Sequence, residues 1–370
     1  MRFFKLLIIV ISLMLLTGCW DRHELDELLI PYVIGIDISE DNPNLVSVTI
    51  TSPSIEETKE PFIRMTDQGI SIQDALYNLQ TKLYRRMGLG HVQVILIGEE
   101  TAKAGIAVFL DTFTRNADVR GGLRMAVVKG RASDFINNAD VKQHPYLGIF
   151  LSGVLEGMKR DNISEDTTLP DFYRFLLADG REPTLPYLIL SPDRQQIIAR
   201  QTAVFLDDRM VGILNRDQSK AFMTLKGNIG NQRIAVEFPR KSPGGFHYAA
   251  VLEERKNRVK VTPVIDGDIV NFKVDVDMTM EIIEYTPSEA TVIPSRLARL
   301  EHTFEKEYKE RMEKVISQLQ GYKADAVGFG EYVRVKYPRF FDNKKWREDF
   351  SKAQFDIEVN INIIRPGSTI

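Results

Sequence analysis

The chain has 370 residues, of which 44% are hydrophobic and 27% are charged, and these proportions are typical of folded globular proteins. Because a single hydrophobic core stops growing beyond roughly 250 to 300 residues, we expect two or three domains. The 48 basic and 51 acidic residues give a slightly negative net charge, which excludes a general attraction to nucleic acid or to anionic lipid.

The first 18 residues have the pattern of a bacterial lipoprotein signal peptide. A short basic start precedes an apolar run over residues 6–16, which is long enough for a signal peptide and too short to span a bilayer. The run leads into Leu16-Thr17-Gly18-Cys19, which resembles the motif cut by lipoprotein signal peptidase. We therefore predict cleavage between Gly18 and Cys19, and attachment of lipid, palmitate included, to Cys19.

Cys19 is the only cysteine of the chain. An intrachain disulfide, a CxxC metal or redox site and a cysteine nucleophile are therefore excluded. Each buried methylene group of a lipid contributes about 0.8 kcal/mol, so two or three acyl chains form a stable anchor. We expect an exported protein that is held at the membrane by this lipid alone.

The region after the anchor alternates strands and helices. A capping box at Asp21–Glu24 precedes a short apolar helical face, and residues 52–69 are polar and are predicted to form a loop. Strands are expected at 31–39, 44–51, 92–97 and 122–129, and helices at 71–87, 99–115, 145–160 and 169–179. The helix at 71–87 is expected to stop at Gly88. This alternation favours an α/β sheet with helices packed on it.

The composition changes at residues 182–192, where three prolines cluster. We place a domain boundary here, between an N-terminal region at 19–190 and a C-terminal region at 191–370, with a possible small middle domain around 191–230. The C-terminal region is predicted to hold strands at 197–206, 210–214, 231–238, 246–254, 258–265, 269–285 and 355–364, and helices at 295–320 and 325–336. The long helix should pack its Leu300, Phe304 and Met312 on a sheet. The fold class is therefore α+β, multi-domain, with mixed sheets and covering helices.

The search for catalytic chemistry finds no candidate residue. The histidines His23, His91, His144, His247 and His302 lack metal-ligand spacing, and no GxSxG motif is present. Acidic pairs such as Asp207-Asp208 and Asp275/Asp277 fit a turn and the solvated face of a strand. The sequence thus predicts no enzyme, no cofactor and no metal site.

Two basic segments have alternative interpretations. Lys82, Arg85 and Arg86 are expected to complement the dipole at a helix C-terminus, and contact with an anionic ligand or a partner is the alternative. The aromatic and basic run 332–346 fits a packing role better than a stacking platform for nucleic acid.

Four segments together resemble the GerAC, or Ger(x)C, family of lipoprotein C subunits of spore germinant receptors. They are Gly18–Leu25; the block from Gln73 through Arg85-Arg86 to Glu100; Ala203-Val204-Phe205 with Met210-Val211-Gly212; and Asp325–Glu331 followed by Tyr337-Pro338, Trp346 and Phe350. They span nearly the whole mature chain in the family's order. His23 and Phe340-Phe341 depart from the residues that are common at those positions, arginine and tryptophan.

This resemblance implies a three-domain α+β fold and a non-catalytic role in nutrient-triggered spore germination. It further implies integral-membrane A and B subunits as partners, and a location on the outer face of the cytoplasmic membrane, which is the inner membrane of the spore. The alternative is a substrate-binding lipoprotein of a membrane transporter, a class that usually shows two similar α/β lobes. A surface hydrolase would require a nucleophile that the sequence lacks.

Overall fold

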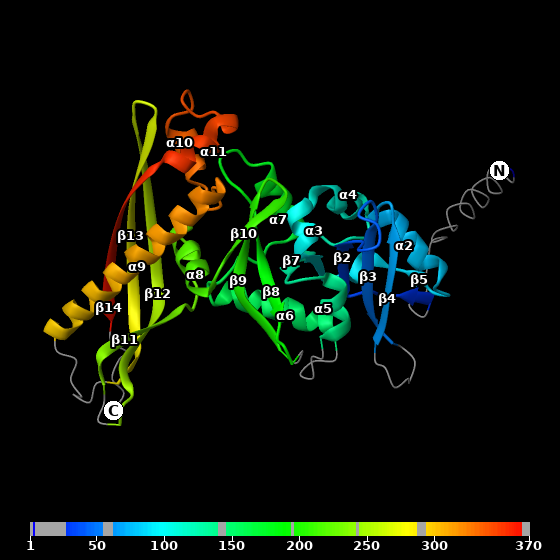
Figure 1. The fold of residues 1–370 in the computed structure, drawn as a ribbon, viewed down its shortest axis with the longest axis horizontal. Helices are drawn as coiled ribbons and strands as arrows, with labels where there is room; N and C mark the ends of the chain where they lie inside the picture. Colours follow the sequence, from blue (N-terminus) through cyan, green and yellow to red (C-terminus); the bar gives the residue numbers. More distant parts are fainter. Residues whose placement is uncertain are drawn as a thin grey trace.

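The computed structural model describes Phe3 and residues 27–54, 62–139, 146–193, 196–241, 244–286 and 294–364. Its two principal sheets, one of eight strands and one of four, follow each other along the longest axis of the molecule (Figure 1). Helices cover both sheets, so the predicted α+β class with mixed sheets is confirmed.

The eight-stranded sheet has a parallel centre and antiparallel flanks. Its strands, in spatial order, are β10 (Arg209–Leu214), β9 (Ile197–Leu206), β8 (Thr184–Leu190), β7 (Arg124–Val128), β6 (Val94–Gly98), β2 (Val33–Ile38), β3 (Val46–Pro53) and β4 (Phe62–Gly69). The run β8-β7-β6-β2 is parallel, and the strands outside it pair antiparallel.

Helices on both faces explain why the central strands are almost entirely apolar. The face that carries Ile34 and Ile95 packs against α2 (Ile72–Thr81), α3 (Glu99–Ala104), α4 (Ala107–Arg115) and α7 (Leu169–Leu176). The face that carries Val33 and Val94 packs against α5 (Ala132–Asn138) and α6 (Leu147–Arg160). Strands buried on both faces read as continuous hydrophobic runs, as β6 does.

A two-stranded sheet holds the start of the described chain. Strand β1 (Leu28–Leu29) pairs parallel with β5 (Arg86–Met87), and Leu28 lies opposite Arg86. A short 3-10 helix, η2 (Leu89–His91), follows β5. This pairing places β1 beside the strand that follows α2 in the chain.

The four-stranded sheet has the order β11 (Arg233–Lys241), β12 (His247–Asp266), β13 (Ile269–Tyr285) and β14 (Gln354–Ile364). Alternate residues of β13 are buried, whereas Asp275 and Asp277 lie on its other face, as predicted. Helix α9 (Pro294–Tyr322) packs on this sheet, and α10 (Phe329–Lys336) and α11 (Asn343–Lys352) lie near one end of it (Figure 1).

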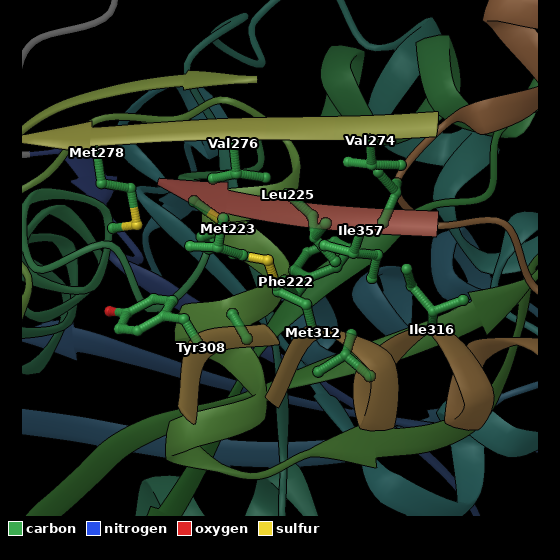
Figure 2. Packing of buried hydrophobic residues seen from close by; sticks show 14 of the residues in the cluster. Phe222, Met223, Leu225, Val274, Val276, Met278, Tyr308, Met312, Ile316 and Ile357 are labelled. Atoms are coloured by element: carbon green, nitrogen blue, oxygen red, sulfur yellow. The ribbon is translucent and has the colours of Figure 1, made fainter. Parts of the chain in front are cut away.

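The prediction for the long helix is confirmed, since Leu300, Phe304 and Met312 are buried in the core beneath it. Figure 2 shows this core, in which α9 faces β13 and β14 and in which α8 (Arg216–Leu225) supplies Phe222 and Met223.

Several predicted elements were wrong, and each error has a local cause. Residues 62–69 form β4 rather than a loop, because an edge strand is paired on one side only and can carry polar residues. The helix expected at 71–87 ends at Thr81, not at Gly88, and the following residues turn into β5. The helix expected at 99–115 is divided at Gly105, whose positive φ of 116° is incompatible with a continuous helix.

Other differences concern elements that the sequence analysis divided or missed. The strands expected at 246–254 and 258–265 are one strand, β12, and the helix expected at 325–336 begins only at Phe329. Helices α5, α8 and α11 and strand β8 were not predicted, and Leu28-Leu29, expected in the short apolar helical face after the capping box, form strand β1 instead. Strands β9 and β10 follow residue 190 in the chain but belong to the first sheet. The domain boundary at residue 190 remains a proposal.

Candidate functional site at the junction of the two sheets

The predicted lipid attachment site lies outside the described residues. Gly18 and Cys19 both precede Glu27, where the continuous description starts, and so does the capping box at Asp21–Glu24. Within the described ranges, no helix is long and apolar enough to cross a membrane. The later motifs of the sequence, at 203–212 and 325–350, lie within the described residues, at the junction of the two sheets.

The described ranges contain no cluster of three or more His, Cys, Asp or Glu side chains that could hold a metal ion. Two of the described histidines have these neighbours: the imidazole of His91 lies 3.2 Å from a guanidinium nitrogen of Arg120, and His302 is exposed beside Glu305.

The carboxylate of Asp325 organises the loop before α10. Its Oδ1 atom accepts the backbone N–H groups of Gly328 and Phe329 at 2.8 and 3.0 Å, and Oδ2 accepts the N–H of Gly330 at 2.7 Å. Oδ2 also accepts the indole N–H of Trp346 at 3.0 Å. Burial raises the pKa of Asp325 to about 6, and these four donors oppose the increase because they stabilise the charged form.

The loop before α10 packs against the segment that precedes β8 of the first sheet. A methyl group on Gly330 would lie 2.6 Å from the Cα atom of Gly180, so only glycine fits there. The N–H of Glu182 donates to the carbonyl oxygen of Asp325 at 3.0 Å, and the N–H of Gly180 donates to Oδ1 of Asn343 at 3.1 Å. Gly330 of the C-terminal motif is therefore explained by a close backbone contact, and Gly328 by its positive φ of 93°.

Charged side chains cross the junction beside this contact. The guanidinium of Arg347 on α11 donates to a carboxylate oxygen of Glu182 at 3.0 Å and also pairs with Asp207 in the turn between β9 and β10. The backbone N–H of Asp207 donates to the other carboxylate oxygen of Glu182 at 2.8 Å. Asp207-Asp208 forms the predicted tight hairpin, and the ion pair with α11 gives that turn a further structural role.

A second ion cluster at the junction is more deeply buried. Glu165 accepts from Lys226 at 2.6 Å and lies 3.5 Å from Arg181. Burial lowers the pKa of Lys226 to about 8 although Glu165 opposes this. For Glu165, burial raises the pKa, but the facing Lys226 and Arg181 outweigh it and hold the pKa below its ordinary value.

The ring of Phe175 packs beneath these cations, 4.1 Å from the guanidinium carbon of Arg181 and 5.4 Å from the ammonium of Lys226. Two cavities, of about 290 and 390 Å³, share Glu165 and Phe175 among their lining residues. Because Glu165 supplies a counter-charge to both cations, the arrangement is suited to fixing the two parts of the chain against each other.

Tyr322 at the end of α9 covers Gly212 of β10. A methyl group at Gly212 would lie within 2.4 Å of three atoms of that side chain. The Gln318 amide donates to the hydroxyl of Tyr322 at 2.7 Å and to the carbonyl oxygen of Ile213 at 3.1 Å. The motif that ends at Gly212 thus serves as a docking point for the long helix.

Sequence reasoning identified the motifs but not their contacts. The packing interpretation of the run 332–346 is confirmed for Trp346, which is buried, whereas Tyr332 is partly exposed. Helix α8 was missed although it carries a signal, because Asn215 and Gln218 form a capping box at its start. No local pattern could have paired Glu165 with Lys226, which are far apart in the chain.

Comparisons with known proteins now identify the family. Residues 21–190 match the family described as the spore germination protein N-terminal domain, and residues 200–367 match the spore germination B3 and GerAC-like C-terminal domain. The chain belongs to the GerAC family of spore germination proteins.

Relatives of the GerAC family match almost end to end. The chain is 22% identical to spore germination protein YndF of Bacillus subtilis, over 98% of this chain and 96% of that protein. It is 23% identical to spore germination protein B3 of the same species, over 98% of both. The crystal structure of the GerBC protein has the same fold, with a TM-score of 0.59, 20% identity, and coverage of 90% of this chain and 96% of GerBC.

Proposed function

We propose that this chain is the lipid-anchored, non-catalytic C subunit of a receptor for nutrient germinants, and that nutrient-triggered spore germination requires it. The observation that carries the proposal is the match of two family models in series, over residues 21–190 and 200–367. The second match includes the motif at 203–212 and the motif at 325–350, which meet at the junction of the sheets. This supports an architecture shared with the family.

The anchor is proposed to be a lipid on Cys19, on the outer face of the inner spore membrane. Support comes from the signal-peptide pattern and from the tetrapeptide that ends at Cys19. A tether of this kind keeps the folded domains near integral-membrane partners and raises their effective concentration. We propose that these partners are the A and B subunits of the receptor.

The absence of catalysis is likewise a proposal. It is supported by the roles of the buried charged groups at the junction, which are engaged by hydrogen-bond donors or by opposite charges. Asp325 accepts four N–H groups, and Glu165 faces two cations. Groups engaged in this way are suited to holding a rigid shape rather than to transferring protons.

The alternative, a substrate-binding lipoprotein of a transporter, fits less well. Such proteins close two similar α/β lobes around a ligand, whereas the two sheets here have eight and four strands and different topologies. Ion pairs such as Arg347–Glu182 also tie the two parts together.

The proposal is tested by deleting the gene and measuring spore germination on a panel of single nutrients. We expect loss of the response to at least one nutrient and restoration by the wild-type gene. Germination by a stimulus that does not require nutrient receptors is the control and should be unchanged. Full nutrient responses in the deletion strain, with related receptors also removed, would contradict the proposed function.

A further inference from the structure

The end of the fold nearest the proposed anchor is defined by the pairing of β1 with β5. Leu28 lies opposite Arg86 in a parallel pair, so the chain runs back toward Cys19 from a point beside Arg85. Seven residues lie between Cys19 and Glu27, and the eight Cα–Cα steps of an extended chain between them span at most about 29 Å. A lipid on Cys19 therefore keeps this end of the molecule close to the membrane.

The shape of the molecule makes this constraint directional. Strand β5 and helix α2 lie at one end of the longest axis, and α9 and β14 lie at the other (Figure 1). With the tether attached beside β5, the four-stranded sheet is the part held farther from the lipid. The surface beside the tether is then the one most able to touch the bilayer.

That surface carries side chains typical of a membrane interface. Ile70, Tyr77 and Tyr84 have exposed fractions of 81%, 65% and 80%. Ile70 lies just before α2, Tyr77 lies on α2, and Tyr84 lies between α2 and β5. The guanidinium of Arg85 lies 5.0 Å from the centre of the Tyr84 ring, and Arg86 is exposed beside it. Tyrosine rings reside at the level of lipid headgroups, and arginine binds phosphate.

The charge around this surface is balanced rather than strongly positive. Lys82 pairs with Asp67 at 2.6 Å, and Asp74 is engaged at the start of α2, where it accepts the N–H of Ile70. Glu27 is exposed at the start of β1. Contact with lipid therefore depends on the aromatic and apolar side chains and on local phosphate binding, and the tether supplies the affinity that net charge does not.

We propose that Ile70, Tyr77, Tyr84, Arg85 and Arg86 form a membrane-contacting surface that lies against phospholipid headgroups. This inference rests on the proposed anchor at Cys19. Contact at a second point restricts rotation about the tether, so the rest of the fold is presented to its partners in one orientation.

The test uses the full-length lipidated protein reconstituted in vesicles that contain phospholipid only. Because the chain has no cysteine other than Cys19, one fluorophore can be attached through Thr81→Cys, at the exposed C-terminal end of α2. A second protein carries Val335→Cys on α10, which is 76% exposed. Quenching by lipids that carry a spin label on the headgroup reports the proximity of each position to the membrane.

We expect quenching at position 81 to exceed that at position 335 by roughly threefold or more, because interfacial contacts reach only about 5–10 Å into the headgroup boundary. Tyr77→Ser with Tyr84→Ser should reduce quenching at position 81 about twofold, since the contact then loses both rings. Tyr332→Ser, on the partly exposed α10, is the matched control and should change nothing.

Vesicle flotation separates this inference from the proposed function. A protein that does not float with the vesicles would contradict the anchor itself. A protein that floats but shows equal quenching at the two positions would overturn the membrane-contacting surface and leave the anchor intact. Shielding of position 81 only after receptor partners are added would show that the surface binds protein, and would likewise overturn the inference.

Discussion

The indole N–H of Trp346 donates to Oδ2 of Asp325 at 3.0 Å, and so links α11 to the loop before α10. Three backbone N–H groups from that loop complete the set of donors around the carboxylate. A buried charge is tolerated where hydrogen bonds surround it in this way. The same loop lies against Gly180, so one aspartate shapes the surface on which the two sheets meet.

Asp325→Asn should therefore destabilise the protein by about 3 kcal/mol, because the amide has one acceptor oxygen and its NH₂ group faces N–H donors. Chemical denaturation measures the free energy of unfolding. Asp118→Asn, at an exposed position, is the control and should have little effect. Equal stability of the two variants would mean that the carboxylate does not hold the loop.

Glu254 on β12 predicts a stability that depends on pH. Its Oε2 atom accepts from the Gln232 amide at 2.6 Å, and burial raises its pKa to about 7. The unfolded chain ionises this group near its ordinary value of 4.5. The folded protein thus binds the extra proton between these values, and the stability contributed by Glu254 is present below 4.5 and lost as the pH rises through 7.

Glu254→Gln should accordingly stabilise the protein at pH 8 by roughly 3 kcal/mol and have little effect at pH 4.5. Melting temperatures of wild type and variant at the two pH values provide the comparison. Glu284→Gln, on the exposed part of β13, controls for the loss of a charge. If the difference between wild type and Glu254→Gln is the same at both pH values, the carboxylate is not perturbed.

The buried Glu165–Lys226 pair predicts strong energetic coupling. Glu165→Gln leaves two cations without a counter-charge and should cost about 3 kcal/mol, whereas Lys226→Met added to it should recover much of that loss. A double-mutant cycle measures the coupling. The exposed pair Lys103–Glu100 is the matched control, with a coupling of about 0.5 kcal/mol or less because water screens it. Additive effects at Glu165 and Lys226 would contradict the coupling.

The core beneath α9 gives a prediction that does not involve charge. Phe304→Ala should cost about 3 to 5 kcal/mol, because the removed ring is fully buried and leaves a cavity against the sheet. Val335→Ala, on the exposed side of α10, should have almost no effect on the melting temperature. An unchanged melt of Phe304→Ala would mean that the apolar stripe of α9 is not packed in solution.

The sequence was informative where one periodicity extends over many residues. The period-2 pattern of β13 and the apolar stripe of α9 predicted both elements and their buried faces, because long amphipathic segments have one way to bury their apolar side. Strand β4 was missed for the opposite reason. As an edge strand it is paired on one side only, and its polar residues resemble those of a loop.

The junction could not be predicted from local patterns. Asp325, Gly330 and Trp346 were recognised only as parts of a family motif, and nothing in their spacing indicates that the carboxylate is buried or that Gly330 touches Gly180. Gly212 is similar, because its need for glycine comes from Tyr322, more than a hundred residues away in the chain. Such requirements arise from tertiary contacts, which a single sequence does not reveal.

We propose that a lipid on Cys19 keeps the protein at the membrane where it supports nutrient-triggered germination. The most direct measurement compares spores that carry wild-type protein with spores that carry Cys19→Ala at equal abundance, by membrane fractionation and by germination on the same nutrients. We predict that the variant leaves the membrane fraction and that nutrient germination falls, while germination by a non-nutrient stimulus is retained. Full nutrient germination with the variant in the soluble fraction would contradict the role of the lipid anchor.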